Sequence, residues 1–493
     1  MNIKKKIIFR IVILLAVSLL AAAPSAMAFS PSHYADSSKL AKGNWVRLRI
    51  LTSGIYQITD EDARSWGFSG ADAIHVFGKG GAPISETLTA DIPDDLPQVP
   101  VVRTSGKLCF YAQGPTTWGS RNNMAFVQIQ HPYATAAYYY VTDDSGYSDI
   151  DITKADNSPG DNPATTFIER LFHESELANP TQSGRELLGE NLLLNSSFTQ
   201  QFTLDGIVDG SKVNVFTEAG AHMPVEGGSA YFAHQYNGKN LSVATEDRIT
   251  ADNGSYVYRR YLMPKSFTLD SDNKLSYTVK LVNSGASINT ARLNFITVNY
   301  TRRLSMGNAS LCFTGDSART MALTGVTDGT RIWDVTVPSQ PVEMNATVSG
   351  STATFAPIAD GVREYVAFNP NGAHAVAEGK EHVANQNLHG QPVPDMLIIT
   401  NARYKQQAER IAALHETQDS MRVLVVTQEE VFNEFSSGSP DAMAYRMACK
   451  MFYDRGDEGG HRLGYLLLMG NGSFDNRQLT SEFKGIAYPA LLT

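Results

Sequence analysis

The chain has 493 residues and a formal net charge of −9. Its length predicts about three domains of ordinary size. Because acidic residues outnumber basic ones and no Lys/Arg-rich run follows residue 28, binding to nucleic acid or to an anionic lipid surface by charge attraction is excluded.

The first 28 residues have the layout of a secretory signal peptide. Lys4, Lys5, Lys6 and Arg10 precede an apolar stretch, which ends in PSAMA with small residues before the predicted cut after Ala28. Cleavage removes four positive charges and no acids, so the net charge would fall from −9 to −13. We therefore expect an exported protein, with an uncleaved membrane anchor as the alternative.

The three cysteines, Cys109, Cys312 and Cys449, are an odd number and lie far apart in the sequence. Each has apolar neighbours, so we expect three buried thiols that pack as small hydrophobic groups. The alternative is one disulfide, because exported proteins meet oxidising conditions in which disulfides form.

A mostly β domain is predicted for residues 29–155. Trp45, Arg47 and Arg49 alternate with apolar residues in a strand-like period, and a second short strand follows the Ser-Gly turn. Asp60 is the expected N-cap of a short helix after it. The Pro- and Asp-rich stretch TADIPDDLPQVP is predicted to be an irregular loop.

A sandwich-like β domain is predicted for residues 160–385. Leu275, Tyr277, Val279 and Leu281 alternate with polar residues, and many other short strands are separated by Gly, Pro, Asn and Asp. The polar stretch that begins at Asn369 and ends at Pro394 is expected to be a linker.

The pattern changes to α/β in residues 394–493. The apolar runs DMLIIT, RVLVVT and YLLLM alternate with two helical segments, and we expect Ser439 to cap the second helix with Pro440 in its first turn. Strands that are apolar on both faces belong in a parallel sheet covered by helices. The predicted fold class is thus two β domains, one sandwich-like, followed by the incomplete start of an α/β parallel-sheet domain.

Sites in such sheets form beyond the carboxyl ends of the strands, which places the loop Gly470-Asn471-Gly472-Ser473 at a site rim. The loop has no lysine of a P-loop, and TNARYK after the first strand has no dinucleotide-binding glycines. The sequence also lacks G-x-S-x-G. No cofactor and no metal are predicted, although loose calcium binding by the acids of residues 143–151 stays an alternative.

A zinc-peptidase motif is excluded as well, because Leu177 stands where HESEL would need its second histidine. Cys449 falls in the middle of a helix on its buried face, and His415 and His461 do not follow strand ends. We therefore predict no catalytic residue within the chain.

The quoted α/β runs, ending in YLLLMGNGSFDNR, resemble the start of the gingipain-type cysteine peptidase domain. The upstream runs GNWVRLRILTSGIYQIT, HVFGKGGAPISE, CFYAQGPTTW and LNFITVNYTRRLSM resemble the member of that family that acts as the C-terminal-signal peptidase, or sortase, of type IX secretion. The resemblance covers nearly the whole mature chain and implies a caspase-like sheet.

The resemblance also implies a cell-surface, outer-membrane-associated cysteine endopeptidase. Its substrates would be exported proteins with C-terminal sorting domains, and it would work with an outer-membrane barrel partner. The catalytic His and Cys would come after later strands, so this chain is expected to be an inactive N-terminal fragment. Asp475 would help to bind a basic substrate residue, while Asn471 stands where the family has an acid.

Two alternatives stay open. Asp475 is equally well explained as a turn-forming residue. The product is alternatively a non-catalytic exported binding or assembly module.

Overall fold

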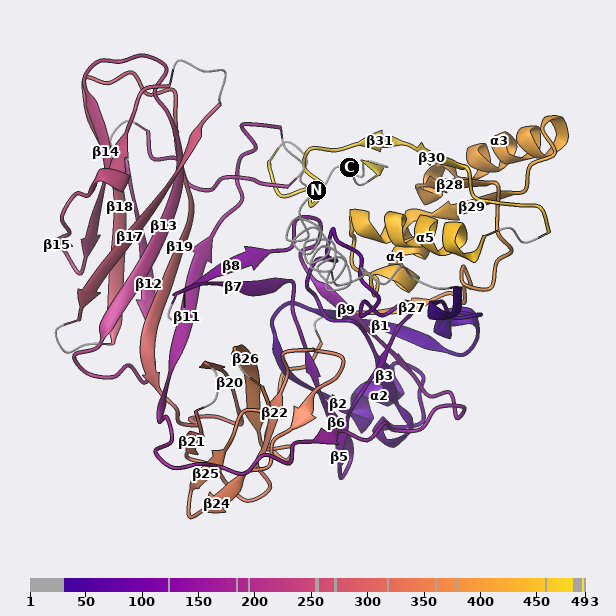
Figure 1. The fold of residues 1–493 in the computed structure, drawn as a ribbon, viewed down its shortest axis with the longest axis horizontal. Helices are drawn as coiled ribbons and strands as arrows, with labels where there is room; N and C mark the ends of the chain where they lie inside the picture. The colour runs from indigo at the N-terminus through magenta and orange to yellow at the C-terminus, as the bar shows by residue number, and fades with distance from the viewer. Residues whose placement is uncertain are drawn as a thin grey trace, which may run out of the picture.

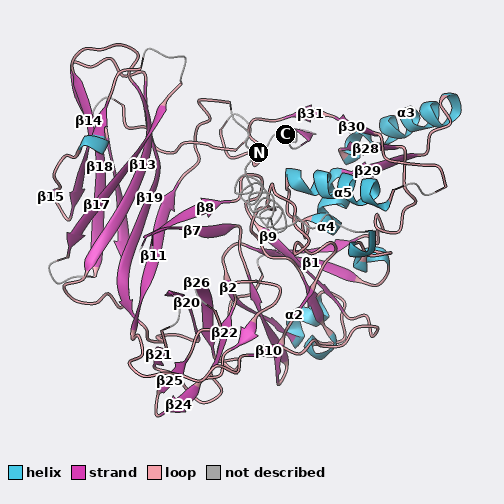
Figure 2. Cartoon of the chain, viewed as in Figure 1, coloured by secondary structure: helices cyan, strands magenta, loops and turns pink. Residues whose placement is uncertain are grey.

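We describe the protein from a computed structural model, in which residues 31–491 are described except for 123–124, 183–184, 194–195, 253–256, 270–272, 317–318, 360, 378, 457–458 and 482–489. The predicted signal peptide lies outside the described residues. No helix among those that are described combines the length and the apolar character needed to cross a bilayer. Figure 1 shows three β units with an α/β segment at the C-terminal end, and Figure 2 shows that the helices are concentrated in that segment.

The first β unit consists of two sheets that enclose a core of buried Val, Leu, Ile and aromatic side chains. The helix α2 (Asp60–Ser65) is capped by Thr59, whose side chain and that of Asp62 form a capping box, so the predicted N-cap at Asp60 is wrong by one residue. Asp60 instead accepts a hydrogen bond from the backbone of Ala71. The strand order is β27-β1-β9-β3-β4 in one sheet and β2-β6-β5 in the other: β1 Trp45–Ile50, β2 Gly54–Thr59, β3 His75–Phe77, β4 Gln98–Val99, β5 Val102–Thr104, β6 Lys107–Ala112, β9 Ala137–Thr142, β27 Gly379–Val383.

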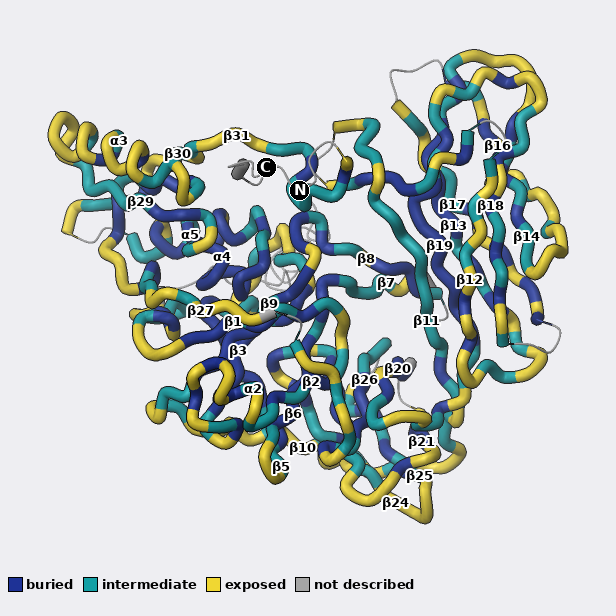
Figure 3. Tube along the Cα trace, turned by 180° about the vertical axis from the view of Figure 1, so that it is seen from behind, coloured by how far each residue is buried: buried dark blue, intermediate teal, exposed yellow. Residues whose placement is uncertain are grey.

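The second unit is a β-sandwich. The predicted inward face of β18, from Leu275 to Leu281, is confirmed, because its four apolar side chains are at most 1% exposed. Figure 3 shows the buried stretches of the central strands β13 and β19. The two sheets have the orders β11-β19-β13-β17 and β12-β18-β14-β15, with β16 on β14: β11 Thr166–Glu174, β12 Ser197–Thr203, β13 Lys212–His222, β14 Ser229–Tyr236, β15 Lys239–Asn240, β16 Arg248–Ile249, β17 Arg259–Thr268, β18 Lys274–Ser284, β19 Thr290–Arg303.

A third unit follows, and a hairpin bridges to the sandwich. Phe313, Phe355 and Tyr365 form the aromatic centre of the core of the third unit. Its sheets have the orders β10-β23-β22-β26-β20 and β21-β25-β24, and the hairpin is β7-β8: β7 Thr116–Asn122, β8 Ala125–Gln130, β10 Thr153–Lys154, β20 Ser310–Asp316, β21 Met321–Thr324, β22 Arg331–Asp334, β23 Val342–Glu343, β24 Thr347–Ser349, β25 Thr352–Phe355, β26 Val362–Phe368.

Strand pairs join segments of the chain that were predicted to belong to different domains. The predicted domains 29–155, 160–385 and 394–493 stay a prediction. Strand β27, from the predicted linker, pairs with β1, and β10 pairs with β23. The polar stretch before Pro394 therefore includes a strand and does not simply connect domains.

The α/β segment confirms the predicted parallel sheet. β28 lies between β29 and β30, and both neighbours run parallel to it. Along β28, Ile398 packs against α3 on one face, while Leu397 and Ile399 pack against α4 and α5 on the other. The elements are β28 Met396–Thr400, α3 Lys405–Gln418, β29 Val423–Thr427, α4 Gln428–Phe435, α5 Ala442–Arg455, β30 Tyr465–Met469, β31 Asn471–Gly472 and β32 Ala490–Leu491.

Two details of this segment differ from the sequence expectation. Helix α5 begins at Ala442 with Asp441 as its N-cap, because Ser437 and Gly438 adopt positive φ and turn the chain before Pro440, so Ser439 does not cap it. β30 was expected to be buried, but it is an outer strand of the described sheet, and Tyr465, Leu466 and Leu468 are exposed by 59%, 47% and 42%.

Candidate active-site rim and the polar cluster beneath it

The carboxyl ends of the three parallel strands meet at one edge of the sheet. Thr400 is in register with both Thr427 and Met469, and its hydroxyl donates to the carbonyl of Met469 at 2.9 Å. The three connections that leave these strands therefore start side by side, which is the geometry of a ligand-binding rim in an open parallel sheet.

The first two connections begin helices at once. Asn401 accepts a hydrogen bond from the backbone of Arg403, and Thr427 forms a capping box with Glu430 that starts α4. Lys405 Nζ lies 3.2 Å from Glu430 Oε1, so this carboxylate is also paired. These side chains are engaged in fixing the helix starts.

The third connection is the loop that contains both predicted substrate-binding residues, Asn471 and Asp475. Asn471 is exposed in β31. Asp475 is 1% exposed, and its carboxylate accepts from the backbone of Leu479 at 3.0 Å and from Thr480, at 2.8 Å to the backbone and 2.7 Å to the hydroxyl. The structure thus brings the two residues into one loop but turns the Asp475 carboxylate into that loop. Their predicted contact with substrate stays a prediction.

Replacing Asp475 with alanine is expected to open this loop locally, because three donors lose an ionised acceptor. The expected effect is a roughly 10- to 100-fold faster amide exchange at Leu479 and Thr480, corresponding to about 1.5–3 kcal/mol for hydrogen bonds to a charged group. Hydrogen exchange followed by mass spectrometry measures it. The matched control is Glu409→Gln on the exposed side of α3, and unchanged exchange in the loop would contradict a structural role for Asp475.

The rim loop is held by the β region. Arg477, whose side chain is 4% exposed, forms an ion pair with Glu176, and Asn179 donates to the carbonyl of Phe474. A cavity of about 320 Å³ is bordered by Arg477 and Leu479 on the loop side and by Glu174 and Glu176 on the other. The rim is therefore built jointly by the α/β segment and the strand end of β11.

The histidines of the α/β segment lie away from the rim. His461 contacts Asp395, which directly precedes β28 and so marks the amino end of the sheet. His415 contacts Asp419 at the exposed end of α3. Cys449 is half-buried on α5, and burial raises the pKa of its thiol to about 11. These three groups form no catalytic pair.

The prediction of three buried thiols is wrong for Cys312. All three cysteines are free; Cys109 is buried, but Cys312 lies on the open face of β20 and lines a cavity of about 600 Å³ between the first and third units and the hairpin. The walls of this cavity keep water from the thiol, and this desolvation raises the pKa of Cys312 to about 12, so little of the thiolate form is expected at neutral pH.

No group of three or more His, Cys, Asp or Glu side chains among the described residues has the arrangement of a metal site. Calcium binding was left as an alternative for the acidic stretch 143–151. There, Asp149 is paired with Arg103 at 2.6 Å, and Asp144 accepts a hydrogen bond from the backbone of Gly146. These carboxylates are engaged within the protein.

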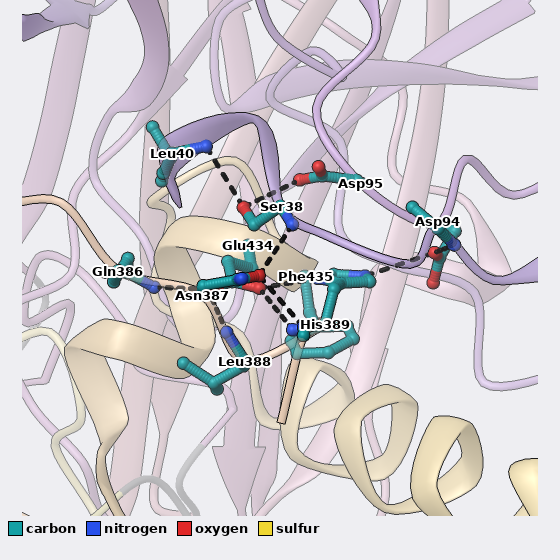
Figure 4. Close-up of polar contacts among 12 residues, drawn as sticks. Ser38, Leu40, Asp94, Asp95, Gln386, Asn387, Leu388, His389, Glu434 and Phe435 are labelled. Atoms are coloured by element: carbon teal, nitrogen blue, oxygen red, sulfur yellow. Dashed lines mark hydrogen bonds and ion pairs between the residues drawn. The ribbon is translucent and has the colours of Figure 1, made fainter. Parts of the chain in front are cut away.

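A buried charged cluster that the sequence analysis missed lies at the start of the α/β segment (Figure 4). The ring of His389, which is 1% exposed, contacts Glu434 at 2.5 Å through Nδ1 and Asp94 at 3.1 Å through Nε2. Burial alone would lower the pKa of His389, but the bonds to the two carboxylates outweigh it and raise the pKa to about 9. The ring is therefore an imidazolium held between two acids at neutral pH.

The cluster joins five separate parts of the chain. Glu434 on α4 also accepts from the backbone of Leu388 at 2.7 Å, and Asp94 accepts from the backbone of Ala35 at 2.8 Å. Lys79 Nζ donates to the carbonyls of Pro93, Asp94 and Phe435. Figure 4 also shows Ser38, Asp95 and Asn387 in the same network. The imidazolium is buried, is hydrogen-bonded to Glu434 through Nδ1 and lies beside Asp94 through Nε2, so it has no lone pair for proton transfer, and we interpret it as a clamp.

The start of helix α4, next to the rim, carries a signal that is visible in the sequence. Thr427 and Glu430 are spaced as a capping box before an apolar run, which is a recognised start signal. His389 carries no such signal, because its partners are distant in sequence and the surrounding stretch is polar.

Comparison with known proteins gives two informative results. Residues 389–491 match peptidase family C25. Over 92% of its length the chain superposes on a crystal structure of dimeric latent PorU from Porphyromonas gingivalis, with 29% sequence identity and a TM-score of 0.81, and it spans 44% of that chain. The predicted resemblance to the gingipain-type peptidases and the predicted fold class are thereby confirmed.

Other solved structures match too weakly to support a conclusion about fold or function. A family GH115 4-O-methyl-α-glucuronidase matches 26% of this chain and 16% of its own at 12% identity, with a TM-score of 0.17. A structure of infectious bursal disease virus, Gx strain, matches 67% of this chain and 82% of its own at 10% identity, with a TM-score of 0.19. No curated protein sequence matches the chain.

Proposed function

We propose, from the premise that the chain is PorU-like and gingipain-related, that the whole protein is a cysteine endopeptidase at the cell surface. It would remove C-terminal sorting domains from proteins exported by type IX secretion. The observation that carries the proposal is the likeness to PorU through the β region and the α/β segment together. Because the chain spans 44% of the PorU chain, this activity is proposed for the whole protein.

In this proposal the rim formed by β28, β29 and β30 is one wall of the peptidase site. Asn471 and Asp475 would lie on its substrate side. The nucleophilic thiol and its histidine base would be supplied by residues outside this chain, because neither Cys449 nor the histidines of the described segment lie at the rim. The partners would be exported proteins with C-terminal sorting domains and an outer-membrane barrel protein.

Protein expressed from the whole gene is expected to cleave an exported substrate ahead of its sorting domain and to be inhibited by thiol alkylation. Changing Cys109, Cys312 and Cys449 together to alanine is expected to alter turnover less than about twofold, because their thiols have raised pKa values and lie away from the rim. Intact-mass spectrometry of the substrate measures both.

The 493-residue chain on its own, which holds no thiol and imidazole pair at the rim among its described residues, is expected to be inactive and serves as the control. Cleavage by this chain alone, or loss of turnover in the folded triple variant, would overturn the proposed assignment.

The alternative is a non-catalytic exported binding or assembly module, which the absence of such a pair from the described rim favours. The two readings differ at β30. In the module, Leu466 and Leu468 would stay exposed in the working protein; in the peptidase, further parts of the protein would cover them. Hydrogen exchange of β30 in the chain and in the whole-gene product distinguishes these readings.

A further inference from the structure

The loop that follows β30 contains an asparagine directly before a glycine, Asn471 and Gly472, and this dipeptide is chemically labile. Glycine has no β-carbon to shield its backbone nitrogen, so that nitrogen can attack the side-chain amide of the asparagine before it. Four asparagines of the sequence precede a glycine, namely Asn237, Asn253, Asn371 and Asn471. Asn253 lies outside the described residues, and the other three differ in how firmly the structure holds the two reacting groups.

At Asn237, in the turn between β14 and β15, the side-chain amide is locked. Its Nδ2 donates to the carbonyl of Lys274 at 3.1 Å, and its Oδ1 accepts from the backbone of Ser276 at 2.7 Å. The amide carbon therefore cannot swing toward the nitrogen of Gly238 until both of these hydrogen bonds have broken.

At Asn371 the attacking nitrogen is engaged instead. The backbone N–H of Gly372 donates to the carbonyl of Asn369 at 2.9 Å, and the carbonyl of Gly372 accepts from Lys107 Nζ at 2.5 Å. The turn is also tightly packed, because a β-carbon at Gly372 would lie 2.6 Å from that of Ala309. The glycine nitrogen is thus held in a hydrogen bond and is not free to attack.

Asn471 is held far less firmly than these two residues. Its side chain is exposed, and no hydrogen bond joins it to the described part of the chain. Its strand β31, in the connection that leaves β30 (Figure 1), has two residues and pairs with the two residues of β32. A ladder this short opens at little cost in free energy.

We propose that Asn471 is a deamidation site, at which the rim loop changes slowly and in one direction from a neutral to an acidic form. The backbone nitrogen of Gly472 gives its proton to solvent base and bonds to Cγ of Asn471. The Cγ–Nδ2 bond breaks, and Nδ2 takes a proton from water and leaves as ammonia.

The product of this first step is a cyclic imide, which water then opens. Water adds to one of the two carbonyl carbons of the imide, and the bond from that carbon to the ring nitrogen breaks. The result is aspartate, or its isomer in which the main chain runs through the side-chain carbon. In total one water is consumed and one ammonia is released, and nothing is oxidised or reduced.

The conversion depends on opening of the loop. In a strand the backbone is extended, so the amide of Asn471 does not face the nitrogen of Gly472, and ring closure has to follow a local opening. Asp475 closes the same loop, because its carboxylate accepts from the backbones of Leu479 and Thr480. The rate of conversion therefore reports how often the rim loop opens.

The product changes the charge of the rim. An aspartate at an exposed position is ionised at neutral pH, so conversion adds one negative charge. The carboxylate of Asp475 is buried and bonded within the loop, so it is not offered to a ligand. Deamidation of Asn471 would supply the loop with an exposed carboxylate, which attracts cationic groups. The modification itself does not depend on the proposed peptidase activity.

Peptide mass spectrometry of the purified 493-residue chain, sampled during incubation at pH 8, tests the proposal. Each converted residue gains the mass difference between an acid and an amide, and chromatography separates aspartate from its isomer. We expect Asn471 to convert at least about tenfold faster than Asn237, where two hydrogen bonds must break first, and also faster than Asn371. At pH 6 the conversion should be slower, because the attack needs the deprotonated nitrogen.

Three variants separate the chemistry from the opening of the loop. Gly472→Ala places a β-carbon beside the attacking nitrogen, at a strand position that alanine can adopt, and is expected to slow the conversion of Asn471 at least about fivefold. Asp475→Ala is expected to speed it about tenfold, in parallel with amide exchange in the loop. Glu409→Gln, on the exposed side of α3, leaves the rate unchanged.

The gain of charge has its own readout. On anion exchange, the converted chain and freshly prepared Asn471→Asp are expected to elute together and later than the fresh parent chain, because both carry one more exposed negative charge.

Three outcomes would contradict the proposal. An intact Asn471 after Asn237 has reacted would exclude the site. The same rate in the parent and in folded Gly472→Ala would exclude attack by the glycine nitrogen, and if this variant misfolds, a rate in the unaltered chain that does not rise from pH 6 to pH 8 would do so. A rate unaffected by Asp475→Ala would refute the dependence on loop opening.

Discussion

Replacing His389 with glutamine is expected to destabilise the chain by about 3–5 kcal/mol, because it leaves Asp94 and Glu434 as buried acids without their shared cation. The loss should appear as a lower unfolding midpoint in denaturant. Since the cluster joins the first β unit to α4, both parts should lose protection from hydrogen exchange together.

Two further variants test whether the loss of stability comes from the unpaired buried acids. His415→Gln removes a histidine of the same segment whose partner Asp419 is exposed, and it should change stability by less than about 0.5 kcal/mol. Adding Asp94→Asn and Glu434→Gln to His389→Gln should recover part of the loss, since the unpaired charges disappear. A His389→Gln protein as stable as the parent would contradict the clamp.

The contribution of His389 is expected to depend on pH in a defined window. Its pKa is about 9 in the folded protein against 6.5 for the ordinary group, so the folded state holds the proton more tightly. The stabilisation is therefore complete below about pH 6.5 and is lost as pH rises through about 9, with a total of about 3 kcal/mol.

The measurement is the difference in unfolding free energy between the parent and His389→Gln at pH 6, 7.5 and 9.5. Lys79 titrates in an overlapping range, because burial lowers its pKa to about 8, and taking the difference cancels most of its effect. The difference should shrink with rising pH. A difference that stays constant, or grows, would show that the imidazolium is not the source of the stabilisation.

The sequence pattern correctly predicted those parts of the fold that depend on residues close together in the chain. The alternation from Leu275 to Leu281 identified a half-buried strand, and the apolar runs of β28 and β29 identified a parallel sheet. Helix ends were placed less well: Thr59 and Asp441 are the caps where Asp60 and Ser439 were expected. Several neighbouring residues can serve as acceptors, and the backbone turn before the helix chooses among them.

The polar sites were beyond prediction because their partners meet only in the folded chain. Asp94 lies in a stretch that has the composition of a solvated loop, and His389 in one that has the composition of a linker. The loop that holds Asn471 and Asp475 was found by its place after a strand, yet the inward turn of Asp475 follows from contacts with Leu479 and Thr480.

The pairing of β27 with β1 sets an order of events for a chain that grows from its N-terminus. Residues 45–49 find their partners at residues 379–383, so the outer edge of the first sheet stays open until residues 379–383 have been made. Contacts of such long sequence separation form slowly, and an open edge meanwhile can pair with other chains. The first unit to be synthesised is therefore completed only after the strands of the two following β units have been made, just before synthesis of the α/β segment begins.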